Sequence, residues 1–270
     1  MFRSERRVQD LIKKAAEGIR AARKVVALTG AGMSVESGIA PFRGVGGIWE
    51  KYNPEEYIHI DAFRSNPAKS WKLLKEMGEA ILRARPNPGH LALAELEQMG
   101  HLSSIITQNI DGLHQEAGNT DVIEFHGNAR RLVCTKCGRQ FRAEDLRLET
   151  LPPGCQCGGI LKPEVVFFGE LIPPGALQRA QQEAQSCDLM LVVGTSAVVY
   201  PAADIPKTAK WCGAEVVEIN PQPTPLSFSV SDYIIKGAAG KVLPQIVAEL
   251  KSDLENSQQI PKQSTGPGPC

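Results

Sequence analysis

The sequence predicts an α/β protein in which helices cover both faces of an open parallel β-sheet. Three observations lead to this fold class. Short runs rich in β-branched residues alternate with helical stretches, as successive βαβ units require. Each run ends in small or polar residues, and a segment with paired cysteines at residues 130–163 interrupts the alternation. The five runs are Val25–Leu28, Ser104–Ile106, Val122–Phe125, Leu189–Val193 and Glu215–Ile219.

In the first half of the chain, residues 4–22 predict an amphipathic helix, because apolar side chains recur on one stripe among many Lys and Arg residues. The first strand then enters a glycine turn. Residues 41–85 are irregular and aromatic, which indicates loops and short helices inserted after that strand. Residues 88–99 predict the next helix.

In the second half, the alternation of strands and helices resumes at Val165 and continues to about residue 251. The remainder, 252–270, is rich in Gln, Ser, Pro and Gly and has almost no apolar side chains, so we expect a disordered tail. The expected elements are helices near 175–186, 201–212 and 240–251 and a last strand at Tyr233–Ile235.

Charge and composition exclude some classes of function. The chain has 270 residues with 30 basic and 30 acidic side chains, so no net charge attracts nucleic acid or an anionic membrane. We find no leader and no apolar run long enough to span a bilayer. We therefore expect a cytoplasmic protein with no nucleic-acid or membrane partner.

The polar motifs share one feature, which is that each follows a predicted strand. Because the carboxyl ends of parallel strands meet at one edge of a sheet, a ligand lying along that edge would meet all of them. The sequence therefore predicts a single crevice. Its motifs are Thr29–Gly32, Thr107–Asp111, His126–Asn128, Gly194–Ser196 and Asn220–Gln222.

The glycine turn Gly30-Ala31-Gly32 would let backbone amides approach a pyrophosphate closely. The dinucleotide fingerprint of dehydrogenases has a third glycine where this chain has Val35, and the next glycine is Gly38. The turn is therefore not that fingerprint. By itself it leaves nucleotide binding and an ordinary tight turn equally open.

Four cysteines form two close pairs, Cys134/Cys137 and Cys155/Cys157. Four thiolates fill the tetrahedral coordination of zinc and leave no position for substrate water, so we expect one structural zinc ion. The second pair has one intervening residue where zinc knuckles commonly have two. A redox pair at the first two cysteines, or a module that has lost its metal, are the alternatives.

His126 differs from the other four histidines, which have solvated, capping or packing contexts. It ends a strand beside the segment that carries Asn109 and Asp111. A neutral imidazole there can accept a proton near pH 7. A catalytic and a structural role for His126 both remain open from its position alone.

Taken together and in order, the motifs resemble those of the sirtuin family, in its prokaryotic form. The resemblance covers about residues 8–250. It is carried by Gly30–Ile39 with Phe42-Arg43, Thr107–His114, His126-Gly127, Pro163 to Glu170, Gly194–Ser196 and Asn220.

This resemblance implies an NAD-dependent protein-lysine deacylase (deacetylase) that transfers the acyl group to ADP-ribose and releases nicotinamide. Its large domain would be a Rossmann-like parallel sheet with helices on both faces, and its smaller domain would combine a zinc ribbon with helices. The implied large domain comprises residues 1–40, 86–129 and 164–251, and the small one 41–85 and 130–163. The implied substrate is an acylated-lysine protein or peptide, and we favour a monomer.

The resemblance also assigns roles to single residues. His126, Asn109 and Asp111 would be catalytic, with His126 as general base on the ribose. The peptide would pair along Val165, Phe167, Gly169 and Glu170. The residues assigned to NAD are Gly30, Ala31, Gly32, Ser34, Phe42, Arg43, Gln108, Asn109, Ile110, Asp111, Gly194, Thr195, Ser196, Asn220 and Ala238.

Acyl specificity depends on the helix after Asn66-Pro67. Sirtuins that prefer acidic acyl groups resemble one another in a Tyr-x-x-Arg pair, and this chain has Leu74 and Met77 at the matching positions. Arginine would bind a distal carboxylate, whereas these side chains leave the pocket apolar. We expect activity on acetyl-lysine, weak activity on succinyl-lysine, and leave longer fatty acyl chains open.

Three other functions compete with this interpretation. A mono-ADP-ribosyltransferase would use the same NAD site but modify a protein covalently. A non-catalytic NAD-binding module would be favoured by the absence of His126, which is present. A zinc ribbon that binds nucleic acid is disfavoured by the neutral charge.

Overall fold

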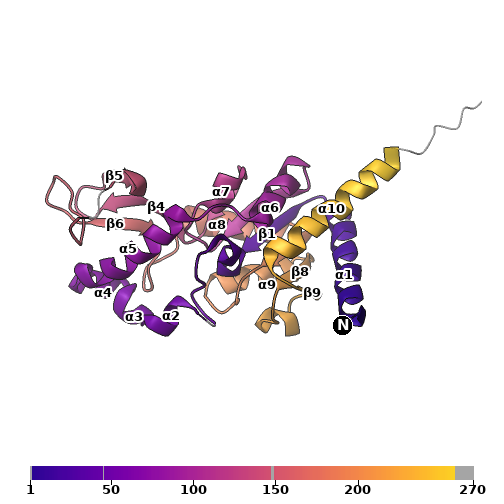
Figure 1. Cartoon of the computed structure of the whole chain (residues 1–270), viewed down its shortest axis with the longest axis horizontal. Coiled ribbons are helices and arrows are strands. Elements are labelled where there is room, and N and C mark those ends of the chain that lie inside the picture. The colour runs from indigo at the N-terminus through magenta and orange to yellow at the C-terminus, as the bar shows by residue number, and fades with distance from the viewer. Residues whose placement is uncertain (1, 45, 147–148, 259–270) are drawn as a thin grey trace, which may run out of the picture.

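The computed structural model describes residues 2–44, 46–146 and 149–258. Its larger part is a six-stranded sheet in which every neighbouring pair is parallel (Figure 1), as predicted. The strand order is β3-β2-β1-β7-β8-β9. The strands are β1 (Val25–Thr29), β2 (Leu102–Thr107), β3 (Val122–Glu124), β7 (Leu189–Val193), β8 (Glu215–Asn220) and β9 (Tyr233–Lys236).

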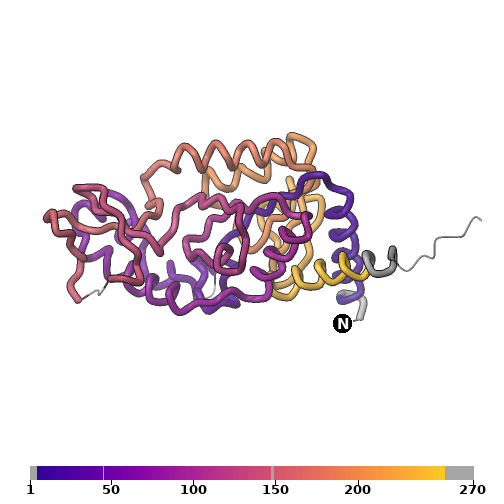
Figure 2. Tube along the Cα trace, turned by 90° about the horizontal axis from the view of Figure 1, so that it is seen from above, coloured from indigo at the N-terminus to yellow at the C-terminus, as the bar shows by residue number. Residues whose placement is uncertain are grey.

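Helices cover both faces of this sheet. On one face, α1 (Phe2–Ala21), α6 (Pro88–Gln98) and α10 (Ala239–Gln258) share a core with β1, β2, β7 and β8. On the other, α8 (Pro174–Ser186) and α9 (Ile205–Trp211) bury small residues such as Ala180 and Ala209. Figure 2 shows α8 along the upper edge, on the side away from α10.

The amphipathic pattern of α1 explains how this helix packs against the sheet. Ile12, Ala15 and Ile19 are completely buried against the sheet core, and basic side chains such as Lys14 face outward. Burying an aliphatic side chain of this size contributes about 1.5–3 kcal/mol. The predicted stripe is therefore the surface that attaches this helix.

The second part of the molecule is a three-stranded antiparallel sheet with the order β5-β4-β6. It lies with a group of four helices at one end of the molecule (Figure 1) and has its own core, which includes Phe63, Trp71 and Leu161. The strands are β4 (Gly127–Cys134), β5 (Gln140–Arg142) and β6 (Leu161–Val165). The helices are α2 (Ile48–Lys51), α3 (Pro54–Tyr57), α4 (Ile60–Ser65) and α5 (Pro67–Arg83).

His126 lies where the chain passes from one sheet to the other, because β3 ends at Glu124 and β4 begins at Gly127. Gly127 has a φ of +80°, and a Cβ atom there would meet the backbone oxygen of Glu164 at 2.1 Å. Only glycine fits this crossing. The crossing holds the histidine at the boundary between the two sheets.

The C-terminal end differs from the prediction. Helix α10 continues to Gln258, past the expected start of the tail at residue 252. The remainder of the predicted tail, 259–270, lies outside the described residues. Among the helices of the described ranges, none is long and apolar enough to cross a membrane.

Candidate active site

A cavity of about 950 Å³ lies at the carboxyl edge of the parallel sheet. Side chains from all five polar motifs line it, which agrees with the crevice expected from the order of the strands. Its predicted lining residues are Ala31, Gly32, Phe42, Arg43, Gln108, Asn109, Ile110, His126, Gly194, Thr195, Ser196, Asn220, Leu74, Met77, Val165, Phe167, Gly169 and Glu170.

The glycine turn after β1 packs directly against the end of β7. The Gly32 amide donates to the Gly194 carbonyl at 2.7 Å. A Cβ atom on Gly194, whose φ is +62°, would lie 2.4 Å from the Met33 nitrogen. The turn continues into two short 3₁₀ helices, η1 (Ala31–Met33) and η2 (Val35–Ser37). Glycine is therefore required here for backbone contact between two strand ends, and Ala31, Gly32 and Gly194 line the cavity at this contact.

Beside this turn, three polar side chains from distant segments form a buried cluster. The Ser34 hydroxyl donates to Asp111 Oδ2 at 2.6 Å, and Asn109 Nδ2 donates to the Gly30 carbonyl and to Ser34 Oγ. Burial raises the pKa of Asp111, and the bonds from Ser34 and from the Leu113 amide partly oppose that shift. Ser34 and Asp111 line an adjoining cavity of about 190 Å³, which Asn109 also borders.

His126 Nδ1 lies 3.1 Å from the backbone oxygen of Gln108. Burial lowers the pKa of the imidazole, and the carbonyl of Gln108 partly opposes the shift. A neutral ring with its hydrogen on Nδ1 has its lone pair on Nε2. The ring lines the cavity, so this site holds an imidazole that can accept a proton.

The segment after β6 forms one wall of the cavity and is tied down by a single lysine. Lys162 Nζ donates to the Val165 carbonyl and to Glu170 Oε2, both at 2.8 Å. The same carboxylate oxygen accepts from the Phe167 amide at 2.9 Å. These bonds fold residues 165–170 into a fixed loop that borders the cavity.

Leu74 and Met77 project from α5 and line both the main cavity and a second one of about 290 Å³. The second cavity lies between α5 and the small sheet, and its walls are largely apolar, including Trp71, Leu132 and Leu146. The main cavity therefore adjoins an apolar space on the side of the small sheet.

Two predicted NAD residues do not line these cavities. Gly30 acts through its backbone, because its carbonyl accepts from the Asn109 side chain. Ala238 directly precedes α10, and its carbonyl accepts from the Lys241 and Val242 amides. Sequence reasoning also missed several residues that line the main cavity. Two signals in the sequence pointed to them, namely the aromatic content of residues 41–85 and the prolines after Gly194–Ser196 and after Asn220. The missed residues are Trp49, Ile58, Val199, Tyr200, Pro201, Pro223 and Pro225.

The other four histidines have the structural roles that their positions indicated, or none in the cavity. His90 forms a capping box with Asn87 at the start of α6, and His114 Nε2 lies 2.9 Å from the Thr29 hydroxyl. His59 caps α4, and like His101 it does not border the main cavity.

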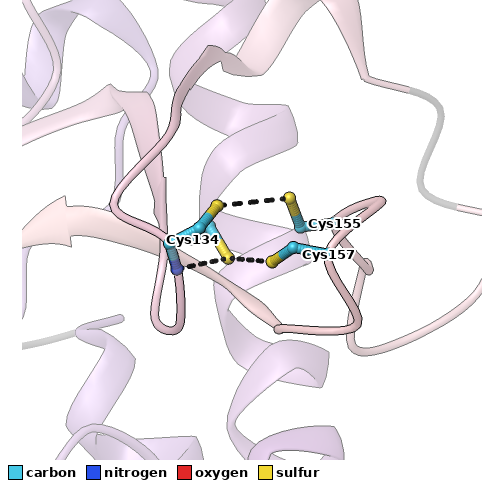
Figure 3. A group of neighbouring side chains, drawn as sticks. Cys134, Cys155 and Cys157 are labelled. Carbon is cyan, nitrogen blue, oxygen red and sulfur yellow. Dashed lines mark hydrogen bonds between the residues drawn. The ribbon is translucent and has the colours of Figure 1, made fainter.

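The four paired cysteines meet at the tip of the small sheet. Their sulfur atoms all lie within 4.8 Å of one another, and Figure 3 shows the side chains of Cys134, Cys155 and Cys157 directed toward a common centre. The Cys137 and Lys136 amides donate to Cys134 Sγ and lower the pKa of that thiol to about 6. Four sulfur donors this close together match the ligand set of structural zinc.

Comparison with protein families and curated sequences places these features in context. The model described as the Sir2 family matches residues 30–201. The NAD-dependent protein deacylase 2 of Pyrobaculum aerophilum is 49% identical over 246 residues, which cover 91% of this chain and 98% of that protein. The NAD-dependent protein deacylase of Pyrococcus abyssi is 44% identical and is covered over 100% of its length.

Solved structures give the same result. A mutant Sir2 homologue in complex with ADP-ribose superposes with a TM-score of 0.86 at 43% identity, over 90% of this chain and 97% of that chain. A Sir2 mutant with a deacetylated p53 peptide and 3′-O-acetyl ADP-ribose has a TM-score of 0.84 at 36% identity, covering 88% and 98%. Sir2Af2 bound to a myristoylated histone peptide has a TM-score of 0.77 at 39% identity, covering 92% and 99%.

Proposed function

Because this chain belongs to the Sir2 family and is an NAD-dependent protein deacylase, we propose that the cavity at the carboxyl edge of the sheet binds NAD and acyl-lysine together. The observation that carries the proposal is the convergence of five chain segments on one cavity that also contains His126. NAD supplies a ribose carbon from which nicotinamide departs and to which the acyl oxygen can bond. The protein's own residues have to position both reactants and move one proton.

Asn109, Asp111 and Ser34 are proposed to hold the nicotinamide amide. They form one buried hydrogen-bonded cluster beside the glycine turn and border the adjoining cavity of about 190 Å³. The Asn109 amide oxygen and the Asp111 carboxylate are acceptors, so together they can recognise the NH2 donor group of a carboxamide. Holding that ring in a fixed orientation favours departure of nicotinamide through positioning.

His126 is proposed as the general base. Its Nδ1 hydrogen is directed at the Gln108 carbonyl, so Nε2 accepts a proton from a ribose hydroxyl, and that oxygen can then take up the acyl group. Such proton transfer contributes about 10²–10⁴-fold to the rate. The lowered pKa of His126 keeps the ring neutral near pH 7, as this role requires.

The acylated peptide is proposed to enter between the loop that Lys162 fixes and the segment Val199–Pro201. Val165 and Glu170 of this loop border the cavity, and so do Val199 and Tyr200. An extended peptide between them would form backbone hydrogen bonds with little dependence on its side chains.

For the acyl group, we propose acetyl and long fatty chains as preferred substrates and succinyl as a poor one. Leu74 and Met77 provide no cation for a distal carboxylate, and they adjoin the apolar cavity of about 290 Å³. The myristoylated peptide bound by Sir2Af2 supports this proposal.

The expected domain division, a monomeric state and a cytoplasmic location are proposed as well. The small sheet and helices α2–α5 have a core separate from those of the large sheet, which supports the division, although Val165 and Phe167 pack in the smaller core. All five predicted motifs of the cavity come from this sequence, so the proposed reaction does not require a second copy. Four thiolates need a reducing compartment, which supports the location.

The test is nicotinamide release with and without an acetylated peptide. We expect release that depends on the peptide, equal amounts of deacetylated peptide and O-acetyl-ADP-ribose, and loss of both products in His126→Ala. Label from NAD that became attached to protein without deacylation would instead support the mono-ADP-ribosyltransferase.

A further inference from the structure

A buried carboxylate lies directly beneath the cavity and has no part in the mechanism above. Glu218 is on the inner strand β8, and its relative exposure is 0%. Its neighbours Val217 and Ile219 face the core shared with α1, α6 and α10, so Glu218 faces the opposite side with Val216. There the 3₁₀ helix η5 (Pro225–Phe228) covers it, with Leu226 in the same core as Val216.

Removing a carboxylate from water is unfavourable unless hydrogen bonds replace its hydration. For Glu218 the replacements are neutral donors. Oε2 accepts from the Ser227 hydroxyl at 2.5 Å and the Ser231 hydroxyl at 3.3 Å, and Oε1 accepts from Asn220 Nδ2 at 3.3 Å. An apolar side chain at this buried strand position would avoid the cost of desolvating a charge. These contacts therefore point to a role beyond stabilising the fold.

The hydrogen bond from Asn220 to Glu218 orients a side chain of the cavity wall. Asn220 borders the cavity, and its Nδ2 also donates to the Thr195 carbonyl at 2.8 Å. A backbone carbonyl and a carboxylate can only accept, so both hydrogens of the amide are used inside the protein. The oxygen of the same amide is then left to accept from a donor on a bound nucleotide.

The hydrogen bond from Ser227 to Glu218 holds a loop of the same wall. Ser227 donates to Glu218, and its oxygen accepts from the Thr224 amide at 2.9 Å, which closes the capping box of η5. Thr224 and Pro225 border the cavity. Ser231 also donates to Glu218. Neither serine borders the cavity itself, but Ser227 holds Thr224, which does, so the two serines share one acceptor and differ in what they hold.

We propose that Glu218 is a positioning residue for the adenosine half of NAD, through Asn220 and through the loop at Thr224. The inference rests on the proposed binding of NAD in this cavity. Glu218 does not contact the cofactor itself. It sets which end of the Asn220 amide faces the nucleotide and fixes the wall next to it, whereas the nicotinamide end depends on Ser34, Asn109 and Asp111.

Glu218→Gln is the most direct test, because it preserves the shape of the side chain. The glutamine amide has only one acceptor oxygen, whereas the carboxylate has two. Its NH2 group must therefore face the NH2 group of Asn220 or the hydroxyl groups of the two serines, and one set of hydrogen bonds is lost. We expect ADP-ribose affinity, measured by calorimetry, to fall by about threefold to tenfold, the equivalent of one ordinary hydrogen bond. The KM for NAD should rise by the same factor, while the KM for the peptide, the kcat at saturating NAD and inhibition by nicotinamide stay unchanged.

The two serines provide a matched pair. Ser227→Ala releases the Thr224 loop and should weaken ADP-ribose binding, whereas Ser231→Ala removes a donor from the same carboxylate and should leave that affinity unchanged. Glu97→Gln is a control for stability, because Glu97 also accepts from a loop, through Asn119 and Thr120, but does not border the cavity. It should lower Tm and leave the KM for NAD as it is.

Equal effects of the two serine variants, or unchanged ADP-ribose affinity in Glu218→Gln, would overturn the inference. So would a rise in the KM for the peptide as large as that for NAD, because it would indicate a general loosening. These outcomes are distinct from failure of the proposed function, in which the wild-type protein itself would bind no ADP-ribose.

Discussion

The Nδ1 atom of His126 lies 3.1 Å from the backbone oxygen of Gln108, so the imidazole proposed as the base is held by a residue whose side chain also lines the cavity. Gln108 Nε2 donates to the Thr195 hydroxyl at 3.0 Å. One residue therefore connects the position of the proposed base with the segment that follows β7. Because the Gln108 carbonyl can only accept, the fold itself selects the tautomer of His126 that carries its hydrogen on Nδ1.

The first prediction concerns the pH dependence of activity. Burial lowers the pKa of His126 below its usual value of 6.5, so the ring is neutral and active above that lowered pKa. As the pH falls through it, the base is protonated and kcat/KM should decline, with an apparent pKa below 6.5. The measurement is a pH–rate profile with acetyl peptide. His126→Ala should lose at least about 100-fold in rate, and an acid limb centred above pH 7 would contradict the assignment.

Stability should depend on pH through His90, which does not take part in the reaction. Burial lowers its pKa to about 4, and its Nδ1 accepts from the Asn87 amide in the cap of α6. The unfolded chain binds this proton near pH 6.5 and the folded one only near 4, so stability is present above pH 6.5 and falls as the pH drops toward 4. The full loss is about 3 kcal/mol.

Urea unfolding between pH 7 and pH 4 measures this effect. His90→Asn should reduce the pH dependence by the share of His90, since an amide can still accept from the cap but does not titrate. The share of the neighbouring His114, whose pKa burial also lowers well below 6.5, should remain. His101→Asn is the control at a partly exposed loop histidine, and the slope should survive it. If His90→Asn and the wild-type protein lost stability in parallel, another group would be responsible.

The sequence sufficed for the elements whose signals are local. The runs of β-branched residues predicted the parallel strands, and the apolar stripe on residues 4–22 predicted α1. The polar motifs that follow the strands predicted the cavity. What it did not give are contacts that depend on tertiary packing. Ser34 and Asp111 are 77 positions apart and meet only because β1 and β2 are neighbours. The crossing at Gly127 depends on β4 pairing with β6, which begins 34 residues later.

Removal of zinc should abolish activity even though the cysteines lie outside the cavity. Cys134 and Cys155 belong to the core that also contains Leu74, Val165 and Phe167, which border the cavity. A structural zinc site supplies roughly 10 kcal/mol or more of folding free energy, so chelation should unfold the small sheet and displace that wall. Metal content, thermal unfolding and deacetylation should decline together and recover when zinc is restored.

Cys137→Ser should reproduce the effect of the chelator, and Cys212→Ser should not, because Cys212 is an exposed thiol outside the cluster. A metal-free protein that kept full activity would show that the cluster is dispensable for the geometry of the cavity.

Gly194→Ala tests the backbone contact between β1 and β7. The added Cβ would meet the Met33 nitrogen at 2.4 Å at a φ of +62°, so it combines strain with a clash. Gly213→Ala separates the two effects, because its φ is +97° and nothing lies within 4 Å of the added atom. We expect Gly213→Ala to cost about 1–3 kcal/mol from strain alone and to bind ADP-ribose normally. Gly194→Ala should be less stable than that variant and lose most of its ADP-ribose affinity, and equal behaviour of the two would refute the contact.

The last prediction concerns acyl length. Ala129 lies on β4 and borders the cavity of about 290 Å³ but not the main one. Ala129→Leu should therefore fill space that only a long acyl chain reaches, and we expect the KM for a myristoyl peptide to rise about tenfold with little change for an acetyl peptide. Met77→Arg alters the boundary between the two cavities and adds a cation, so succinyl turnover should increase relative to acetyl. Mass spectrometry of the three peptides, supplied in competition, measures both ratios. If Ala129→Leu slowed acetyl and myristoyl removal equally, the second cavity would have no part in choosing the acyl chain.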